Sequence, residues 1–517
     1  MSVLVNAAAA LALAAAGLAQ GLRWWRVLQR EHYHPGAVLL FWRRWIERPW
    51  RVRAAPSKVS WVLAAVSAAL IAVALSTSFW FVGVAAVTVL GLVWPRGLSI
   101  KGRTSTLAWT RRLKTVAGAT LVLTIIVLVI GVVTGGAWFA AVSLVLGAPL
   151  LIDASARVTA PLERRLAQRF VDEAAARLAK VSPLVIGITG SYGKTSTKQH
   201  LAELLGGYVG VVPTPRSFNN RAGLSRAINE NLVDGTKVFI AEMGTYGPGE
   251  IADLCAWCPP RIAVITAIGP VHLERMNSLD TIERAKYEIT STADTVIVNV
   301  DDDRLVAWPD RLRAEGKRVV TAGSAREGDV TVREVGERWR VTVDGVEQGV
   351  IVPVAGVRPT NLACALAAAL AVGRSIDELL ERCARLGAVP NRLQSATAPS
   401  GVVVIDDTFN ANPASARSAV AFAAGLPTAG RRVLVTPGLI ELGSTQAKEN
   451  ADLAAFARAA GLELVTVNRT NAASLLAGYG ADALSVDTRQ QAVAWVRASL
   501  HATDVVLYVN DLPDHYP

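Results

Sequence analysis

The sequence predicts an α-helical membrane domain followed by two α/β domains, of which the second is the smaller. Long charge-free apolar stretches fill much of the first 152 residues, and basic residues gather in the loops between them. After residue 184, β-branched runs alternate with helical patterns, which is typical of α/β domains with largely parallel sheets. The length of 517 residues accommodates about three domains.

The apolar stretches predict five membrane spans. Residues 1–22 carry no charge, and neither do 59–95 and 115–152. Each of the two longer stretches is roughly twice the ~20 residues of one spanning helix. Each is also interrupted near its middle, by STSF at 76–79 and by TGGA at 134–137. We therefore expect helices at about 2–22, 59–76, 79–95, 116–134 and 137–152.

The charges between the spans predict their orientation. Residues 23–58 hold nine Lys or Arg against two acids, and residues 96–114 hold six against none. Because cytoplasmic loops accumulate Lys and Arg, both loops are expected inside. Positive charge follows the first apolar run, whereas a secretory signal peptide carries it before, so the first span is expected to be retained. The chain is thus predicted to be a multi-pass protein of the cytoplasmic (inner) membrane, with its N-terminus outside and everything after residue 153 in the cytoplasm.

Composition narrows the classes of function. The formal net charge is +11, but the basic residues surround apolar spans, which favours a bilayer over nucleic acid. Several tryptophans in the first basic loop suit the headgroup level, a carbohydrate or lipid ligand being the alternative: Trp24, Trp25, Trp42, Trp45 and Trp50.

Four cysteines in the whole chain cannot form a disulfide framework. The lone C-x-x-C of Cys255 and Cys258 is interpreted as two ordinary cysteines at a helix end, in preference to a metal or redox site.

After the last span, residues 156–183 predict an amphipathic connector helix. Its apolar stripe includes Leu162, Leu166, Phe170 and Leu178, with Pro161 in its first turn.

The stretch LVIGITGSYGKTST, starting at residue 184, predicts a strand, a phosphate-binding loop and a helix. Glycines let backbone N–H groups curl around phosphate oxygens, and the helix N-terminus adds partial positive charge. Lys194 is expected to reach the terminal phosphates, and the Thr195 hydroxyl to bind Mg²⁺. Ile188 stands where the strict motif has a glycine, but the G-x-x-G-K-T core is intact. The predicted loop contacts to ATP are Gly190, Ser191, Gly193, Lys194, Thr195 and Ser196.

Further stretches follow in a fixed order, and together the set resembles the Mur ligase family of bacterial cell-wall synthesis. These are SFNNRAG (217–223), AEMGTYGPGEIADL (241–254), ITAIGPVHLERMNSLDTIERAKYEI (265–289), NVDDD (299–303), TNLACALAAAL (360–370), NRLQ (391–394) and IDDTFNANPASARSAV (405–420). They are most similar to the branch that adds D-alanyl-D-alanine to UDP-muramoyl-tripeptide. The resemblance implies ATP and Mg²⁺ as cofactor and metal, and it covers about residues 184–445.

The resemblance assigns a metal and catalytic set. Glu242 ends an apolar strand, so its carboxylate is expected at the carboxyl edge of the sheet, and the family uses it on Mg²⁺. His272 resembles the second-metal ligand, and Lys286 matches the lysine that family members carbamylate, which would convert a cation into an anion able to hold Mg²⁺. The alternative roles are a helix-capping acid for Glu242, a purely structural histidine for His272 and an ordinary surface lysine for Lys286. The catalytic set is therefore Lys194, Glu242, His272 and Lys286, and the metal set is Thr195, Glu242, His272 and Lys286.

Other matched residues are assigned to the nucleotide. Asn361 resembles the asparagine that touches adenine, and Arg392 the arginine that joins the phosphates when the last domain closes. Asp407, Asn410 and Asn412 follow a predicted strand, where they would meet ATP across the domain cleft. Asn220 is expected near the reacting carboxyl group or the γ-phosphate.

The implied reaction is ATP-dependent amide-bond formation through an acyl phosphate. The family's usual small uridine-binding domain does not fit before residue 184, so the acceptor carboxylate is expected on a lipid-linked or membrane-associated molecule, with an amino acid or peptide as amine donor. Arg358 replaces the first of two paired asparagines, and VVLYVNDLPDHYP stands where relatives carry a Lys-Gly-Ser segment that contacts the amine substrate. The identity of the amine substrate is therefore left open.

We thus predict a membrane domain at 1–155, a connector at 156–183, a P-loop ATPase domain with a parallel-rich sheet at 184–388 and a Rossmann-like C-terminal domain at 389–517. The strands GVVVIDD, RRVLVTPG, LELVTVN and VVLYVN are expected in the last domain. The alternatives are a D-alanyl-D-alanine-adding ligase acting on a UDP-linked muropeptide, an ATPase coupled to membrane transport, a membrane kinase, and a scaffold that binds nucleotide without chemistry.

Overall fold

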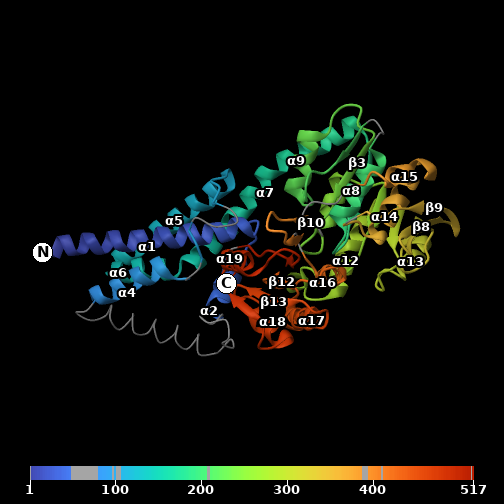
Figure 1. Ribbon diagram of the computed structural model, residues 1–517. Helices are drawn as coiled ribbons and strands as arrows, with labels where there is room; N and C mark the ends of the chain where they lie inside the picture. Colours follow the sequence, from blue (N-terminus) through green and yellow to red (C-terminus); the bar gives the residue numbers. More distant parts are fainter. Residues whose placement is uncertain are drawn as a thin grey trace.

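A computed structural model places a helical N-terminal part at one end of the molecule and two α/β domains at the other (Figure 1). It describes residues 2–47, 80–95, 98–100, 106–206, 210–354, 356–386, 394–408, 411–513 and 515–516. The predicted span at 59–76 and the predicted domain boundary at 388/389 lie outside these ranges.

The N-terminal part consists of helices. They are α1 (Ser2–Arg30), α2 (Ala37–Glu47), α4 (Trp80–Val93), α5 (Arg111–Val133), α6 (Ala137–Leu146) and α7 (Ala148–Val181). By length and composition, α1 (from Asn6) and α5 are able to cross a membrane, and α6 and α7 form a further pair that qualifies together but is bent by 78°. Only 17% of the apolar stretch of α5 is buried.

The helix bounds differ from the predicted ones around residue 147. Gly147 ends α6 and precedes α7, and Pro149 occupies the first turn of α7, so the predicted 137–152 helix is broken there. The expected connector is the distal part of α7, and Pro161 lies in the interior of this helix instead of its first turn. Its buried face carries Ala174 and Leu178, which pack in the next domain, whereas Leu162 and Phe170 are exposed.

Two tryptophans of the first basic loop pack inside the helical part. Trp24 and Trp45 are buried in a hydrophobic cluster with residues of α1, α2, α5 and α7. Trp50 lies outside the described residues. Packing between the helices therefore accounts for the burial of these two rings.

The middle domain is built on a nine-stranded sheet of order β2-β3-β1-β4-β5-β6-β7-β8-β9. Its strands are β1 (Leu184–Thr189), β2 (Val211–Pro213), β3 (Val238–Glu242), β4 (Ile262–Ile265), β5 (Thr295–Asn299), β6 (Arg318–Gly323), β7 (Val330–Val335), β8 (Arg338–Val343) and β9 (Val346–Ile351). All neighbours up to β7 are parallel, and β7-β8-β9 are antiparallel.

Helices cover both faces of this sheet, as parallel strands require. They are α8 (Lys194–Leu205), α9 (Arg221–Asn231), α10 (Glu250–Trp257), α11 (Leu273–Met276), α12 (Leu279–Tyr287), the 3₁₀ turn η1 (Glu288–Ser291), α13 (Trp308–Ala314), α14 (Pro359–Ala371) and α15 (Ile376–Cys383). One hydrophobic core includes α8 and α14, and the other includes α9, α10, α12 and the end of α7.

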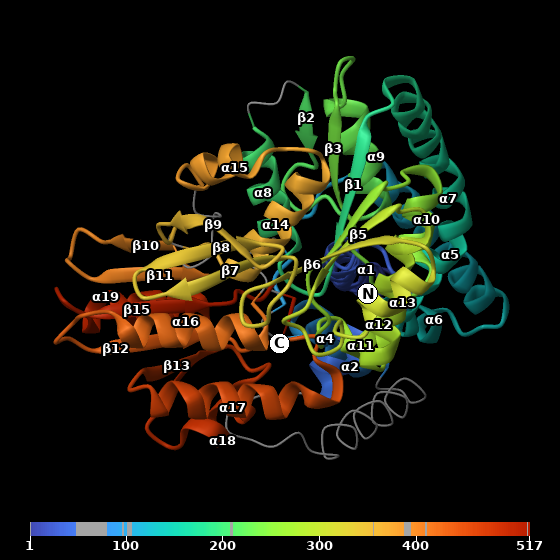
Figure 2. The same ribbon diagram turned by 90° about the vertical axis from the view of Figure 1, so that its right-hand side faces the viewer.

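The C-terminal domain has a six-stranded sheet of order β10-β11-β15-β12-β13-β14, parallel except for β10. The strands are β10 (Gln394–Thr397), β11 (Val403–Asp407), β12 (Arg432–Thr436), β13 (Glu463–Val467), β14 (Leu484–Val486) and β15 (Val505–Val509), and the four strands expected from sequence are β11, β12, β13 and β15. The helices are α16 (Pro413–Gly425), the 3₁₀ turn η2 (Gly443–Thr445), α17 (Gln446–Ala459), α18 (Ala472–Tyr479) and α19 (Arg489–Ser499). Figure 2 shows this domain, in orange to red, below the middle domain.

Candidate nucleotide and ligase site

The predicted phosphate loop lies between β1 and α8. Gly193 has a φ of +80°, and a Cβ at this position would lie 2.5 Å from Asn361 Oδ1, so glycine is required both by conformation and by space. α8 then begins at Lys194, whose Nζ donates to the Gly190 carbonyl at 2.7 Å. The sequence thus forms the expected strand, glycine turn and helix N-terminus, and Asn361 of α14 contacts the turn.

Glu242 ends β3, in register with Ile188 of β1, so its side chain lies beside the phosphate loop. Thr195 Oγ1 lies 3.1 and 3.2 Å from the two Glu242 carboxylate oxygens. Lys198 Nζ is 2.9 Å from Oε2 in an ion pair that is almost fully buried, and Asn219 Nδ2 donates to Oε1 at 3.2 Å. The structure therefore brings the two predicted metal ligands Thr195 and Glu242 together.

This donor set fits Mg²⁺. A hydroxyl and a carboxylate are hard oxygen ligands, and Mg²⁺ in nucleotide sites is held by one or two carboxylates together with substrate phosphates. Within the ranges described, no group of three His, Cys, Asp or Glu side chains is arranged to hold a metal ion. The remaining ligands would come from the nucleotide and water.

Lys286 is buried on α12. Burial, together with the nearby charge of Lys194, holds the pKa of the Lys286 amine well below its ordinary value. The two predicted catalytic lysines are therefore electrostatic neighbours, and Lys286 is not a surface residue.

His272 contacts the C-terminal domain. It precedes α11 with a φ of +61°, its Nδ1 hydrogen-bonds the Glu441 carboxylate, and its ring lies 4.5 Å from the ring of Tyr246, between centroids. Burial would raise the pKa of Glu441, but the His272 hydrogen bond and the nearby charges outweigh it and keep this pKa below its usual value. Among the residues that the structure describes, the His272 side chain thus makes its polar contact with Glu441.

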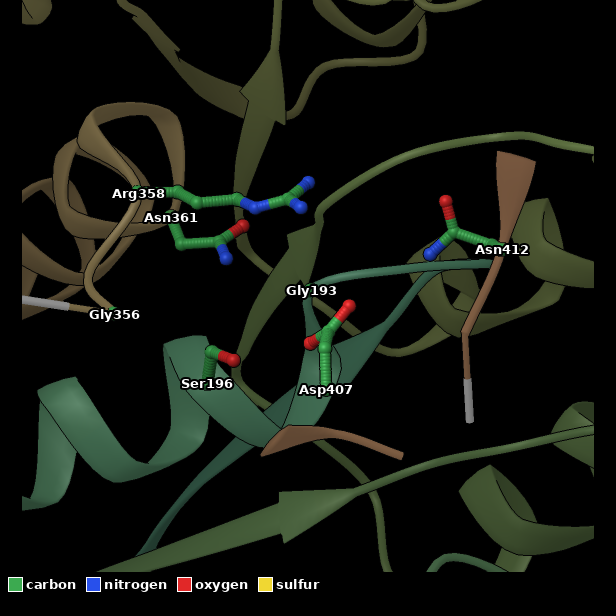
Figure 3. Close-up of a pocket in the computed structure, with 7 residues that line it drawn as sticks. All are labelled: Gly193, Ser196, Gly356, Arg358, Asn361, Asp407 and Asn412. Carbon is green, nitrogen blue, oxygen red and sulfur yellow. The ribbon is translucent and has the colours of Figure 1, made fainter. Parts of the chain in front are cut away.

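A pocket lies between the two α/β domains (Figure 3). The middle domain contributes Gly193, Ser196, Gly356, Arg358 and Asn361, and the C-terminal domain contributes Asp407 and Asn412. Burial lowers the pKa of the Arg358 guanidinium, and the charge of Asp407, which lines the same pocket, opposes this effect only in part. Five of these residues come from segments predicted to bind ATP.

Two predicted asparagines also cap helices. Asn220 Oδ1 accepts from Gly223 N at 2.9 Å at the start of α9, and Asn412 Oδ1 accepts from Ser415 N at 2.9 Å at the start of α16. Ser191 Oγ donates to the Gly269 carbonyl at 3.0 Å. Arg392 and Asn410 lie outside the described residues.

Sequence reasoning missed four residues that join this site, namely Lys198, Asn219, Tyr246 and Glu441. Lys198 follows Lys194 by four residues, which places both on one face of α8, and this spacing was the available signal. The interpretation of the C-x-x-C motif as ordinary cysteines accords with the burial of Cys255 and Cys258, which raises the pKa of both thiols.

Two consecutive parts of the chain match two domains of the Mur ligases. Residues 188–372 match the Mur ligase middle domain, and residues 391–509 match the Mur ligase glutamate ligase domain. The UDP-N-acetylmuramoyl-tripeptide–D-alanyl-D-alanine ligase of Mycobacterium tuberculosis is 33% identical over 367 residues, covering 64% of this chain and 71% of that protein. The protein of the same name from Escherichia coli is 30% identical over 328 residues, covering 60% and 71%.

Solved structures show the same fold. MurF from Acinetobacter baumannii has a TM-score of 0.59 at 24% identity, covering 66% of this chain and 77% of its own. MurF from Thermotoga maritima in complex with ADP has a TM-score of 0.58 at 23% identity, covering 67% and 80%. The matched region begins at residue 188, so it includes none of the N-terminal helices α1 to α7. The chain belongs to the Mur ligase family and is an ATP-dependent ligase that forms amide bonds.

Proposed function

We propose that this ligase joins an amine to the carboxylate of a lipid-linked or membrane-associated acceptor at the inner face of the cytoplasmic membrane, in cell-wall or envelope biosynthesis. The observation that carries the proposal is the exposed apolar surface of α5, where Leu121, Val129 and Val133 are among the exposed side chains. Large exposed apolar surfaces are rare on water-soluble proteins and suit a bilayer. A membrane-embedded domain directly before the ligase domains would keep the active site close to lipid-linked substrates.

The residues of the site have distinct parts in the reaction. An acceptor carboxylate oxygen attacks the γ-phosphorus of ATP, and the bond to the β–γ bridging oxygen breaks, which gives an acyl phosphate and ADP. The amine then attacks the acyl carbon, the bond to phosphate oxygen breaks, and the amine loses a proton as the amide forms. Lys194 and the backbone N–H groups of the glycine turn hold the phosphates, and Asn361, Asp407 and Asn412 enclose the nucleotide from both sides of the cleft.

Mg²⁺ bound at Thr195 and Glu242 would neutralise charge on the β- and γ-phosphate oxygens. Lys198, paired with Glu242, holds this carboxylate in position beside the loop. His272, bonded to Glu441, joins the catalytic edge of the middle domain to the C-terminal domain.

Carbamylation of Lys286 belongs to the same proposal. Addition of CO₂ requires an uncharged amine, and the burial of Lys286 beside Lys194 favours this form. Protein incubated with ¹³C-bicarbonate should give a carbamate carbon signal in NMR spectra that is absent from Lys286→Gln. A spectrum of the parent without this signal would contradict carbamylation.

The test of the acceptor uses the full chain in lipid nanodiscs. Phosphate release would be measured with a soluble UDP-linked muropeptide and with a lipid-linked muropeptide, each with D-alanyl-D-alanine or with single amino acids, and Lys194→Ala would serve as the inactive control. We expect amine-dependent phosphate release with the lipid-linked acceptor. Preference for the soluble acceptor would overturn the proposal and support the second candidate, the D-alanyl-D-alanine-adding reaction named for the relatives.

A further inference from the structure

The C-terminal segment after β15 lies among the N-terminal helices. Leu512 and Tyr516 are buried in the hydrophobic cluster that contains Trp24 of α1 and Phe41 and Trp45 of α2. The rings of Phe41 and Tyr516 meet edge to face with centroids 4.8 Å apart. The Trp45 indole Nε1 donates to the His515 carbonyl at 3.0 Å. The segment after β15 is therefore packed in the core of the helical domain.

Glu31, directly after α1, connects the helical domain to both ligase domains. Its Oε1 lies 2.9 Å from His515 Nε2, and its Oε2 accepts from Arg275 Nη2 of α11 at 2.6 Å. His515 and Glu31 are both buried, so this contact is shielded from water. One carboxylate of the helical domain thus joins the end of the C-terminal domain to the middle domain.

Arg44 of α2 makes a second connection to the same helix. Its guanidinium pairs with Glu274 of α11 and lies over the ring of Tyr516, 5.2 Å from the centroid. The Glu274 backbone N–H lies 3.4 Å from the Glu441 carbonyl. α11 therefore has the helical domain on one side and the C-terminal domain on the other, and it begins directly after His272, the partner of Glu441.

We propose that the helical domain holds the C-terminal domain against the middle domain through Glu31, Arg44 and the C-terminal segment, so that the nucleotide cleft is closed before ATP binds. Glu31 and Arg44 are then positioning residues for the cleft lined by Gly193, Arg358 and Asp407. This role is independent of which acceptor and amine the enzyme uses. It assigns the helices a part in the catalytic cycle beyond that of a membrane anchor.

The test measures the cleft directly, in the full chain in nanodiscs. Spin labels at Glu381→Cys in α15 and Ala498→Cys in α19 lie on exposed positions of the two ligase domains, and the four native cysteines are buried. Pulsed electron paramagnetic resonance should give one distance population that ADP and Mg²⁺ leave unchanged. If the distance between the two labels shortens when ADP and Mg²⁺ are added to the parent protein, the proposal is overturned, and no variant is needed to show it.

Variants then test whether Glu31 and Arg44 hold the cleft closed. Glu31→Gln combined with Arg44→Gln should produce a second, longer distance without nucleotide, which ADP reverses, and about two- to tenfold weaker ADP binding, because only the closed fraction binds. Arg44→Lys should restore part of the closed population. Arg43→Gln is the matched control, since Arg43 pairs with Glu47 on the exposed side of the same helix. A combined variant that folds and stays closed without nucleotide would also contradict the proposal.

Discussion

Thr195 and Glu242 are 47 residues apart in the sequence and meet with the threonine Oγ1 3.1 and 3.2 Å from the two carboxylate oxygens. Their contact follows from two adjacent parallel strands, because β1 leads into the phosphate loop and β3 ends at Glu242. The carboxyl ends of parallel strands lie at one edge of a sheet, which is where ligands of open α/β sheets bind. The contact therefore brings the two predicted metal ligands together beside the phosphate loop.

Glu242→Gln tests this part of the site. Glutamine keeps the shape but loses the charge that a metal needs, so we expect phosphate release to fall about 10²–10³-fold, equivalent to several kcal/mol of transition-state stabilisation. The concentration of Mg²⁺ required for half-maximal activity should rise as well. Glu230→Gln, at an exposed position of α9, is the control. An unchanged Mg²⁺ requirement in Glu242→Gln would exclude Glu242 as a ligand.

Arg358→Asn tests the cleft by introducing the asparagine that the family pattern has at this position. The Arg358 guanidinium lines the pocket beside Gly193 and Asp407, and it makes no hydrogen bond to any other described residue. A nucleotide would supply the missing acceptors, and hydrogen bonds to a charged group contribute about 1.5–3 kcal/mol. We therefore expect ADP binding, measured by calorimetry, to weaken roughly tenfold or more, since each 1.4 kcal/mol is a factor of ten.

Arg358→Lys is the conservative comparison for this position. It keeps the charge without the forked guanidinium and should lie between the parent and Arg358→Asn. ADP binding of parental strength in Arg358→Asn would show that the arginine does not contact the nucleotide.

The phosphate loop, the strand β3 that ends at Glu242 and the four C-terminal strands were predictable because each depends on a local sequence pattern. A β-branched run followed by glycines and Lys194 specifies strand, turn and helix within about twenty residues. Glu242 was predictable for the same reason, since it ends an apolar strand. The family pattern then supplied Asn361 and Asp407, which lie far apart in the sequence but line one cleft.

The contacts between domains were not predictable, because no local pattern encodes them. Nothing in the residues around Glu31 or His515 indicates that two side chains 484 positions apart are hydrogen-bonded. The break at Gly147 was missed for a different reason, since the apolar run continues through it and periodicity does not register a bend of 78°. His272 was assigned to the site from sequence, but its pairing with Glu441 of the C-terminal domain is known only from the structure.

The predicted topology can be tested with single introduced cysteines, because the four native cysteines are buried. Thr134→Cys lies at the turn after α5 and is expected outside, whereas Ala325→Cys lies on the exposed surface of the middle domain and is expected in the cytoplasm. A membrane-impermeant maleimide should label Thr134→Cys in intact spheroplasts and Ala325→Cys only after lysis. Labelling of Ala325→Cys in intact spheroplasts would reverse the proposed orientation.

The stability of the middle domain should depend on pH through His200. This side chain is fully buried in α8, and burial lowers its pKa from 6.5 to about 4. Above pH 6.5 the histidine is neutral in both the folded and the unfolded chain, so it has no effect on the pH dependence there. As the pH falls from 6.5 towards 4, the unfolded chain takes up a proton that the folded chain does not, and the free energy of unfolding decreases by roughly 3 kcal/mol over this window.

The corresponding measurement is the thermal unfolding of the detergent-solubilised protein between pH 7.5 and pH 4.5, compared with His200→Leu. Leucine has no titratable group and a similar apolar bulk, so the variant should lose less stability than the parent as the pH is lowered. His501→Leu is the control because His501 is exposed, and it should follow the parent. Parallel pH profiles for the parent and His200→Leu would show that His200 is not kept neutral by its burial, and the pH dependence would then have to come from other titratable groups.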